Sequence, residues 1–129
     1  MEWGLKWNMD QGEVVEGTQR HLRCSGQVSV VPDDGTELGF RIVSPNEIRG
    51  QMECALGNID AILKEAEMNR SNVVFLRFFT TDIGGFLDNY DIYATWIDKA
   101  GTRPPQSLIG VQCLILPELV VEIEVEAAA

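Results

Sequence analysis

The sequence predicts one α+β domain in which two helices cover one face of a mixed sheet. Three observations predict this class. Apolar and polar residues alternate near the start and at the end of the chain, as they do in half-buried strands. Apolar residues recur at three- and four-residue spacing in two segments between these strands, as they do in amphipathic helices. The chain has 129 residues, of which 45% are hydrophobic, so it suits one domain with its own core and leaves no room for a second.

The first part of the chain is predicted to form strands. Residues 3–7 and 13–15 indicate a weak hairpin. In the segment 21–31 apolar residues alternate with polar ones, which predicts a strand, and the turn residues of 32–36 end it. A short strand over 38–43 is then expected to return alongside.

A long helix is predicted to follow. Ser44 is the expected N-cap, Pro45 the first helical residue, and Glu47 completes a capping box. One apolar stripe then runs for about 20 residues, formed by Ile48, Met52, Ala55, Leu56, Ile59, Ile62, Leu63 and Ala66. Gly50 and Gly57 reduce helix propensity, and we expect them to permit close approach to the sheet.

The rest of the chain predicts a strand, a helix and two strands. Residues 72–80 are nearly all apolar, which is typical of a strand covered on both faces. Residues 86–99 form a second amphipathic helix, and Gly101 ends it. Strands are expected over 107–114 and 119–126, and the last places Glu122, Glu124 and Glu126 on one face. Because only two helices are predicted, a second subunit is the expected cover of the other sheet face.

Charge and composition exclude several classes of function. The net charge of −10 argues against a nucleic-acid partner, since such binding depends on cations that neutralise phosphates. His21 is the single histidine, so a multi-histidine metal site is excluded and a catalytic triad would depend on it. No metal, cofactor or membrane partner is expected, because phosphate-binding glycine motifs and an apolar run of the ~20 residues that span a bilayer are absent.

The cysteines and the N-terminus favour a cytoplasmic protein. Cys24, Cys54 and Cys113 are odd in number and widely spaced, which fits reduced thiols better than a set of disulfides. The first residues lack the basic region and apolar stretch of a secretion signal.

An ordered set of short motifs resembles the RidA family, which is also called YjgF or endoribonuclease L-PSP. The resemblance covers about residues 20–127. Its elements are Ser25-Gly26-Gln27, a helix carrying Gln51, Asn58 and Leu63, a strand leading to Asp82, Phe86 seven residues before Tyr93, and the closing segment 107–126 with Glu122-Ile123-Glu124.

The resemblance implies a chorismate-mutase-like fold with a mixed six-stranded sheet, a last β-hairpin and two helices on one face. It also implies a homotrimer with ligand clefts between neighbouring subunits. Active members hydrolyse reactive enamines and imines to a 2-oxo acid and ammonia. In them an arginine at the start of the penultimate strand binds the substrate carboxylate, and the first glutamate of the Glu-Ile-Glu motif positions water.

One position departs from that pattern. The residues that match the family's pocket are Ser25, Gly26, Ser107, Leu108 and Glu122, the last as the candidate catalytic carboxylate. Gln106, however, stands where the resemblance requires the arginine. An arginine–carboxylate pair contributes about 1.5–3 kcal/mol, so replacing it by a neutral amide costs roughly tenfold or more in carboxylate binding. A tyrosine typical of active members has no counterpart near Gly12.

Three functions stay open. The first is a small-molecule binder with weak or absent deaminase activity, in which Gln106 and Glu122 hold a ligand between subunits. The second is an active deaminase in which Arg77 or Arg103 supplies the missing cation. The third is a structural or regulatory trimer with a vestigial cleft. A ribonuclease is the least favoured because the chain is acidic.

Two of these residues also have simpler interpretations. Three glutamates at alternate positions usually form a solvated strand face, which applies to Glu122. Arg77 lies on the same face of its predicted strand as Phe75 and Phe79. A cation on such an apolar face needs a carboxylate partner. We therefore expect an ion pair between Arg77 and one of the glutamates.

Overall fold

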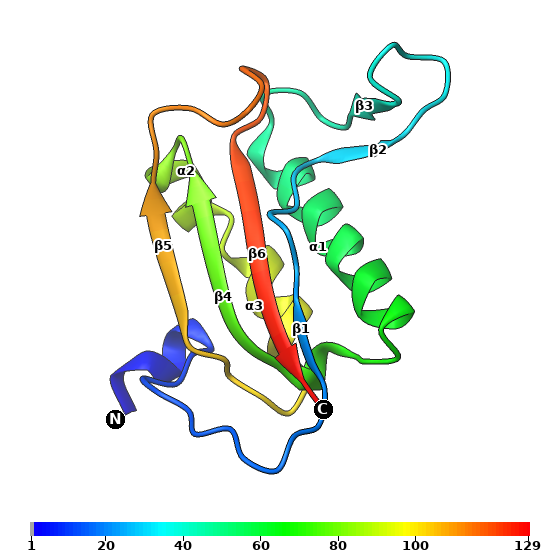
Figure 1. Cartoon of the computed structure of the whole chain (residues 1–129). Coiled ribbons are helices and arrows are strands. Elements are labelled where there is room, and N and C mark those ends of the chain that lie inside the picture. The colour runs from blue at the N-terminus through cyan, green and yellow to red at the C-terminus, as the bar shows by residue number, and fades with distance from the viewer. Residues whose placement is uncertain (1) are drawn as a thin grey trace.

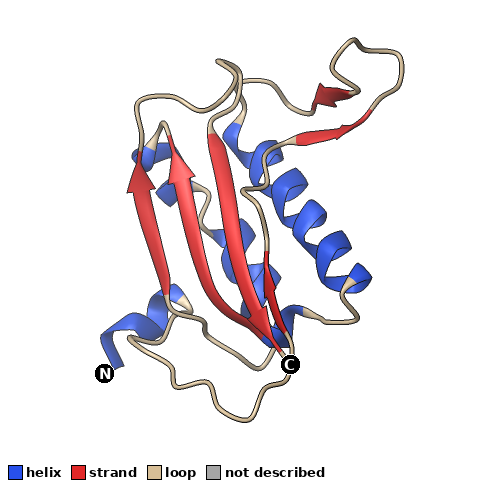
Figure 2. Ribbon diagram, viewed as in Figure 1, coloured by secondary structure: helices blue, strands red, loops and turns tan. Residues whose placement is uncertain are grey.

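A four-stranded mixed sheet and the helices packed on one of its faces form the two layers of the computed structural model, which describes residues 2–129 (Figures 1 and 2). The strand order is β1-β6-β4-β5. The strands are β1 (His21–Arg23), β4 (Val73–Thr80), β5 (Gln106–Gly110) and β6 (Val121–Ala128). β6 is antiparallel to both β1 and β4, whereas β5 is parallel to β4 and forms an edge. The predicted α+β class with a mixed sheet is confirmed.

The predicted single six-stranded sheet is wrong. β2 (Val30–Pro32) and β3 (Phe40–Ile42) form a separate antiparallel pair, which projects beside α1 in Figure 1. The strand predicted over 21–31 is interrupted, because between β1 and β2 only Gln27 keeps a bridge, to Ile123. The chain therefore leaves the main sheet before it reaches β2.

Two further predicted pairings are also wrong. The last two strands do not form a hairpin, because β4 lies between β5 and β6 and pairs with both. The expected hairpin of 3–7 with 13–15 is replaced by a 3-10 helix, Glu2–Trp7, followed by a loop. Gly4 is buried there, and a Cβ on it would lie 2.6 Å from the carbonyl oxygen of Met9, so the chain folds back on itself instead of extending.

Helix α1 (Ile48–Glu65) begins later than predicted. Ser44 and Asn46 have φ values of +53° and +61°, so the backbone there is left-handed and cannot start a right-handed helix. Glu47 is the N-cap, and its carboxylate accepts a hydrogen bond from the backbone N–H of Gly50 at 2.8 Å. A Cβ on Gly50 would lie 2.3 Å from Oγ of Ser44, whereas Gly57 has no neighbour within 4 Å. The glycines therefore do not serve approach to the sheet, and Gly50 instead leaves room for the cap.

The predicted second helix is two helices, α2 (Ile83–Asp88) and α3 (Asp91–Asp98). Asp82 caps α2 by accepting a hydrogen bond from the backbone N–H of Gly85 at 3.0 Å, so this helix starts before Phe86. The side chain of Asn89 donates to the carbonyl oxygen of Gly85 at 2.8 Å and ends α2. The break places Tyr90 between the two helices. Gly101, with φ of +78°, follows α3 as expected.

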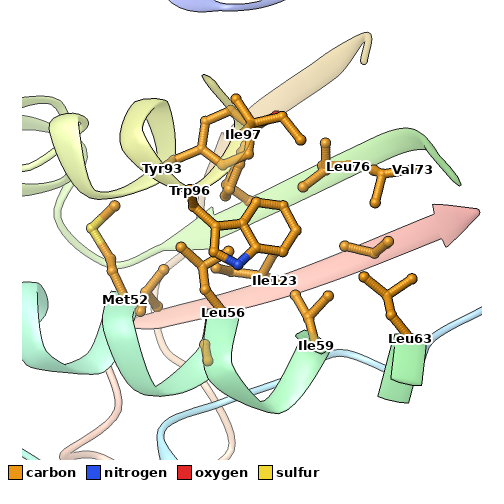
Figure 3. Close-up of a cluster of buried hydrophobic side chains, with 14 of the residues drawn as sticks. Met52, Leu56, Ile59, Leu63, Val73, Leu76, Tyr93, Trp96, Ile97 and Ile123 are labelled. Atoms are coloured by element: carbon orange, nitrogen blue, oxygen red, sulfur yellow. The ribbon is translucent and has the colours of Figure 1, made fainter. Parts of the chain in front are cut away.

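The hydrophobic core lies between the sheet and the helices. Figure 3 shows side chains of α1 meeting those of β4, β6 and α3 in one cluster. Fully buried members include Met52, Leu56, Ile59, Leu63, Leu76, Tyr93, Ile97 and Ile123. The apolar stripe predicted on α1 is thus confirmed at its centre, because its helical spacing directs one face at the sheet.

The other face of the sheet carries Phe75, Arg77 and Phe79, which are only partly buried. No described helix covers this face (Figure 1). Arg77 forms the predicted ion pair, since its Nη1 lies 3.7 Å from Oε1 of Glu124, and its guanidinium lies 4.7 Å from the ring of Phe75. The expected cover by a second subunit stays a prediction.

None of the helices within 2–129 is long and apolar enough to cross a membrane.

Candidate functional site

The first residue of β5, Gln106, lines an apolar cavity of about 200 Å³. Strand alternation puts Gln106 and Leu108 on one side and Ser107 on the other. The cavity is completed by Trp7, Met9, Phe78, Phe86, Leu87 and Tyr90. It therefore joins the edge strand, the N-terminal segment and the junction between α2 and α3.

Contacts between distant parts of the chain hold the N-terminal segment over this cavity. The backbone N–H of Asp10 donates to the carbonyl oxygen of Arg103 at 2.8 Å, and their side chains form an ion pair with an N–O distance of 3.1 Å. The ring of Trp7 meets that of Tyr90 edge to face, with 5.4 Å between their centres. These contacts bring Trp7 and Met9 beside the head of β5.

The amide of Gln106 belongs to a hydrogen-bonded chain. Its Nε2 donates to Oη of Tyr90 at 2.5 Å and lies 3.4 Å from Sδ of Met9. The hydroxyl of Tyr90 donates in turn to the carbonyl oxygen of Trp7. Burial raises the pKa of Tyr90, and the hydrogen bond from Gln106 acts in the opposite direction. The phenol is therefore neutral at physiological pH and holds its proton for Trp7.

The candidate catalytic carboxylate lies elsewhere. Glu122, in β6, and Gly26 line a second cavity of about 290 Å³. Its remaining lining is apolar, formed by Val28, Val30, Phe40, Ile115, Leu116 and Leu119. Backbone hydrogen bonds between Gln27 and Ile123, of 2.8 and 2.9 Å, hold Gly26 next to Glu122. Burial raises the pKa of Glu122, and the negative charge of Glu124 adds to this effect.

The remaining predicted site residues line neither cavity. Ser25 and Ser107 are exposed, and the carbonyl oxygen of Ser25 accepts a hydrogen bond from Nε2 of Gln27 at 3.0 Å. Arg77 is paired with Glu124, and Arg103 with Asp10. Among residues 2–129, no lysine or arginine lines the cavity of Gln106 or that of Glu122. Within one chain, Gln106 and Leu108 therefore line one cavity, while Gly26 and Glu122 line the other.

The sequence does not identify the other lining residues, from Trp7 to Tyr90, as site residues. Tyr90 falls within the helix predicted over 86–99, and Trp7 within the weak hairpin predicted over 3–7. Met9 carried no signal. Tyr90 is separated from Trp7 by 83 positions, and Met9 from Gln106 by 97, so local spacing could not predict these contacts.

The whole-chain comparisons identify the family. A sequence model of the family described as endoribonuclease L-PSP matches residues 11–129. This chain belongs to that family. The resemblance to RidA (YjgF) proteins is thereby confirmed, whereas the loss of the arginine remains an inference from the motif.

Two relatives illustrate the similarity in sequence. A RutC family protein of Aquifex aeolicus is 31% identical over 109 residues, which are 84% of this chain and 78% of that protein. TdcF of Escherichia coli (strain K12), provisionally named a reactive intermediate deaminase, is 30% identical over 106 residues, which are 81% of this chain and 74% of that protein.

Solved structures share the fold. YyfB, a Rid family protein from Yersinia pestis, has a TM-score of 0.81 and 27% identity, over 100% of this chain and 92% of that one. E. coli TdcF with bound serine has a TM-score of 0.72 and 27% identity, over 92% of this chain and 86% of that one.

Gly26→Ala is expected to move the carboxylate of Glu122 without unfolding the protein. A Cβ at Gly26 would lie 2.1 Å from Oε2, 2.5 Å from Cδ and 2.9 Å from Cγ of Glu122, so the whole Glu122 side chain must adopt another rotamer, while the backbone is not among the clashing atoms. Because the carboxylate must turn toward solvent, its raised pKa should fall. An NMR titration of the Glu122 carboxyl carbon measures this, with Gly12→Ala as control, since a Cβ at Gly12 meets nothing within 4 Å. An unchanged Glu122 titration in the folded variant would contradict the prediction.

Glu122→Gln is expected to stabilise the protein at neutral pH. The pKa of Glu122 is raised above 4.5, so the folded state binds this proton more tightly than the unfolded chain does. The stability linked to this proton is thus present below the unfolded pKa and lost as the pH rises through the folded one. The advantage of the variant over the natural chain should grow between about pH 4 and about pH 7 in urea unfolding. Glu37→Gln, in an exposed loop, is the control, and a pH-independent difference would refute the effect.

Proposed function

We propose that this L-PSP family member is a RidA-like small-molecule-binding protein with little or no enamine or imine deaminase activity. The observation that carries the proposal is the neutral amide of Gln106 at the head of β5, where the family resemblance requires a carboxylate-binding arginine. Its cavity lining, within the described residues, contains no cation. Arg77 and Arg103, the two possible substitutes, are engaged with carboxylates of the same chain. A carboxylate would therefore be desolvated in this cavity without a compensating charge.

We also propose a homotrimer with ligand clefts between subunits, as the family resemblance implies. Two observations support it. The sheet face bearing Phe75 and Phe79 has no described helix over it. Gln106 and Glu122 line separate cavities in one chain, so a ligand that touches both requires a neighbouring subunit. Light scattering should give the mass of three 14.4 kDa chains, and a monomer would contradict this part of the proposal.

Hydrolysis of 2-aminoacrylate, generated in place by a pyridoxal-phosphate enzyme, tests the proposed function. Pyruvate formation should not exceed the uncatalysed rate, whereas an active family member assayed in parallel should accelerate it. Clear acceleration by this chain would contradict the proposal and favour an active deaminase. A structural trimer with a vestigial cleft would be favoured instead if no small molecule raised the temperature of unfolding, because a ligand specific for the folded state must stabilise it.

A further inference from the structure

The hydrogen bonds around Gln106 determine which end of its amide is free. The carbonyl oxygen of Trp7 can only accept, so the hydroxyl of Tyr90 must give its single proton to it. The Tyr90 oxygen can then only accept from Gln106. The amide must therefore present Nε2 to Tyr90, at 2.5 Å.

Met9 supports the same orientation. Its thioether sulfur is a weak acceptor and lies 3.4 Å from Nε2 of Gln106. If the amide were reversed, its carbonyl oxygen would face two atoms that have no proton to offer. The two hydrogens of the NH₂ group are thus donated to Tyr90 and to Met9.

The carbonyl oxygen of Gln106 is left as a buried acceptor without a partner. Such a group costs free energy unless it receives a hydrogen bond. In the described chain no protein donor supplies one. An N–H or O–H group of a ligand would satisfy it, whereas a carboxylate oxygen would be a second acceptor facing the first.

The rest of the cavity suits an apolar body. Apart from the Gln106 amide and the Tyr90 hydroxyl, its lining side chains are aromatic, aliphatic or methionine. Its volume is about 200 Å³. An apolar cavity of roughly 150 Å³ admits benzene, so one ring-sized molecule fits.

We propose that the Gln106 cavity selects uncharged hydrogen-bond donors carried on an aromatic or aliphatic body, and discriminates against carboxylates. This inference rests on the proposed small-molecule-binding function and specifies its ligand class. The free oxygen of Gln106 receives the donor, and the rings of Phe86 and Trp7 contact the body. Tyr90 acts as a positioning residue, because it holds the amide in the orientation that leaves this oxygen unpaired.

Two matched ligand pairs test the inference on the full chain by calorimetry and thermal shift. Indole and 1-methylindole differ in a single N–H donor, while benzamide and benzoate differ in donor and charge. Indole and benzamide should bind at least tenfold more tightly than their partners and should raise the temperature of unfolding more. Equal binding of indole and 1-methylindole, tighter binding of benzoate, or no binding of either donor would each overturn the inference.

Three variants test whether the preference for hydrogen-bond donors arises at Gln106. Gln106→Met keeps an unbranched side chain of similar length but removes the acceptor, so the preference for indole over 1-methylindole should disappear while apolar binding persists. Tyr90→Phe frees the amide to reverse, so the preference should weaken. Gln112→Met, at an exposed position, should leave the preference unchanged. Deaminase turnover by the natural chain would contradict the proposed function but would not change the ratio of the affinities for indole and 1-methylindole. Failure of the proposed function and failure of this inference are therefore distinguishable.

Discussion

Gln51→Leu is expected to lower the free energy of unfolding by about 3 kcal/mol. The side chain of Gln51 is fully buried on α1 and every polar atom of it is paired. Its Nε2 donates to the carbonyl oxygens of Ser44 and Glu118 at 3.0 and 2.7 Å. Its Oε1 accepts from the backbone N–H of Val120 at 2.9 Å. Leucine fills a similar volume but leaves these three backbone groups without their partner.

The loss should be large because Gln51 joins two distant segments. It ties the left-handed turn before α1 to the segment that leads into β6, and so it helps to hold Glu122 in place. Urea unfolding measures the change, with Gln112→Leu as a matched control on the surface, for which a change within about 0.5 kcal/mol is expected. A loss below about 1 kcal/mol for Gln51→Leu would show that these hydrogen bonds contribute little.

Gln106→Arg is expected to raise the affinity for benzoate by roughly tenfold to a hundredfold, since a charge-assisted pair contributes about 1.5–3 kcal/mol. The guanidinium can also donate to Tyr90, as the glutamine amide now does. The same change should give measurable pyruvate formation from 2-aminoacrylate if only the cation separates this site from that of active RidA-like proteins.

The control for this variant is Gln112→Arg, which adds the same charge at an exposed position. A rise in benzoate affinity in both variants would mean that the overall charge of −10, and not the site, governs anion binding. Tighter benzoate binding without pyruvate formation would show that the water-positioning part of the site has diverged as well. An unchanged affinity for benzoate would contradict the assignment of Gln106 to the ligand.

The local elements were predicted where periodicity alone decides them. The apolar spacing of α1 predicted its buried face, and the alternation in β6 predicted that Glu122 and Glu124 lie on the face opposite Ile123. The apolar periodicity of a helix or strand depends only on residues close together in the sequence, so it can be recognised without knowledge of the fold.

Errors arose wherever a distant contact overrode a local preference. The Ser-Pro-Asn-Glu pattern is a good helix start, yet Ser44 adopts a left-handed backbone and its carbonyl oxygen accepts from Gln51. The strand predicted over 21–31 leaves the main sheet after Gln27, and β4 separates the strands that were expected to form the last hairpin. Strand pairing joins residues far apart in the chain, and no local period specifies the partner.

The candidate site likewise contains residues that the sequence predicted and residues that only the fold brings together. Gln106 and Glu122 were selected by their positions in a family pattern, which short motifs can carry. The Tyr90 hydroxyl, the Met9 sulfur and the Trp7 carbonyl that orient the Gln106 amide come together only through folding.

Residue types and their spacing thus predicted an α+β domain, and the resemblance of its short motifs indicated the L-PSP family and predicted that Gln106, at the head of β5, stands where the family pattern has an arginine. Only the tertiary structure decided which atom of that amide is free, because a hydrogen-bond direction depends on every partner in the network, and those partners lie up to 97 positions apart.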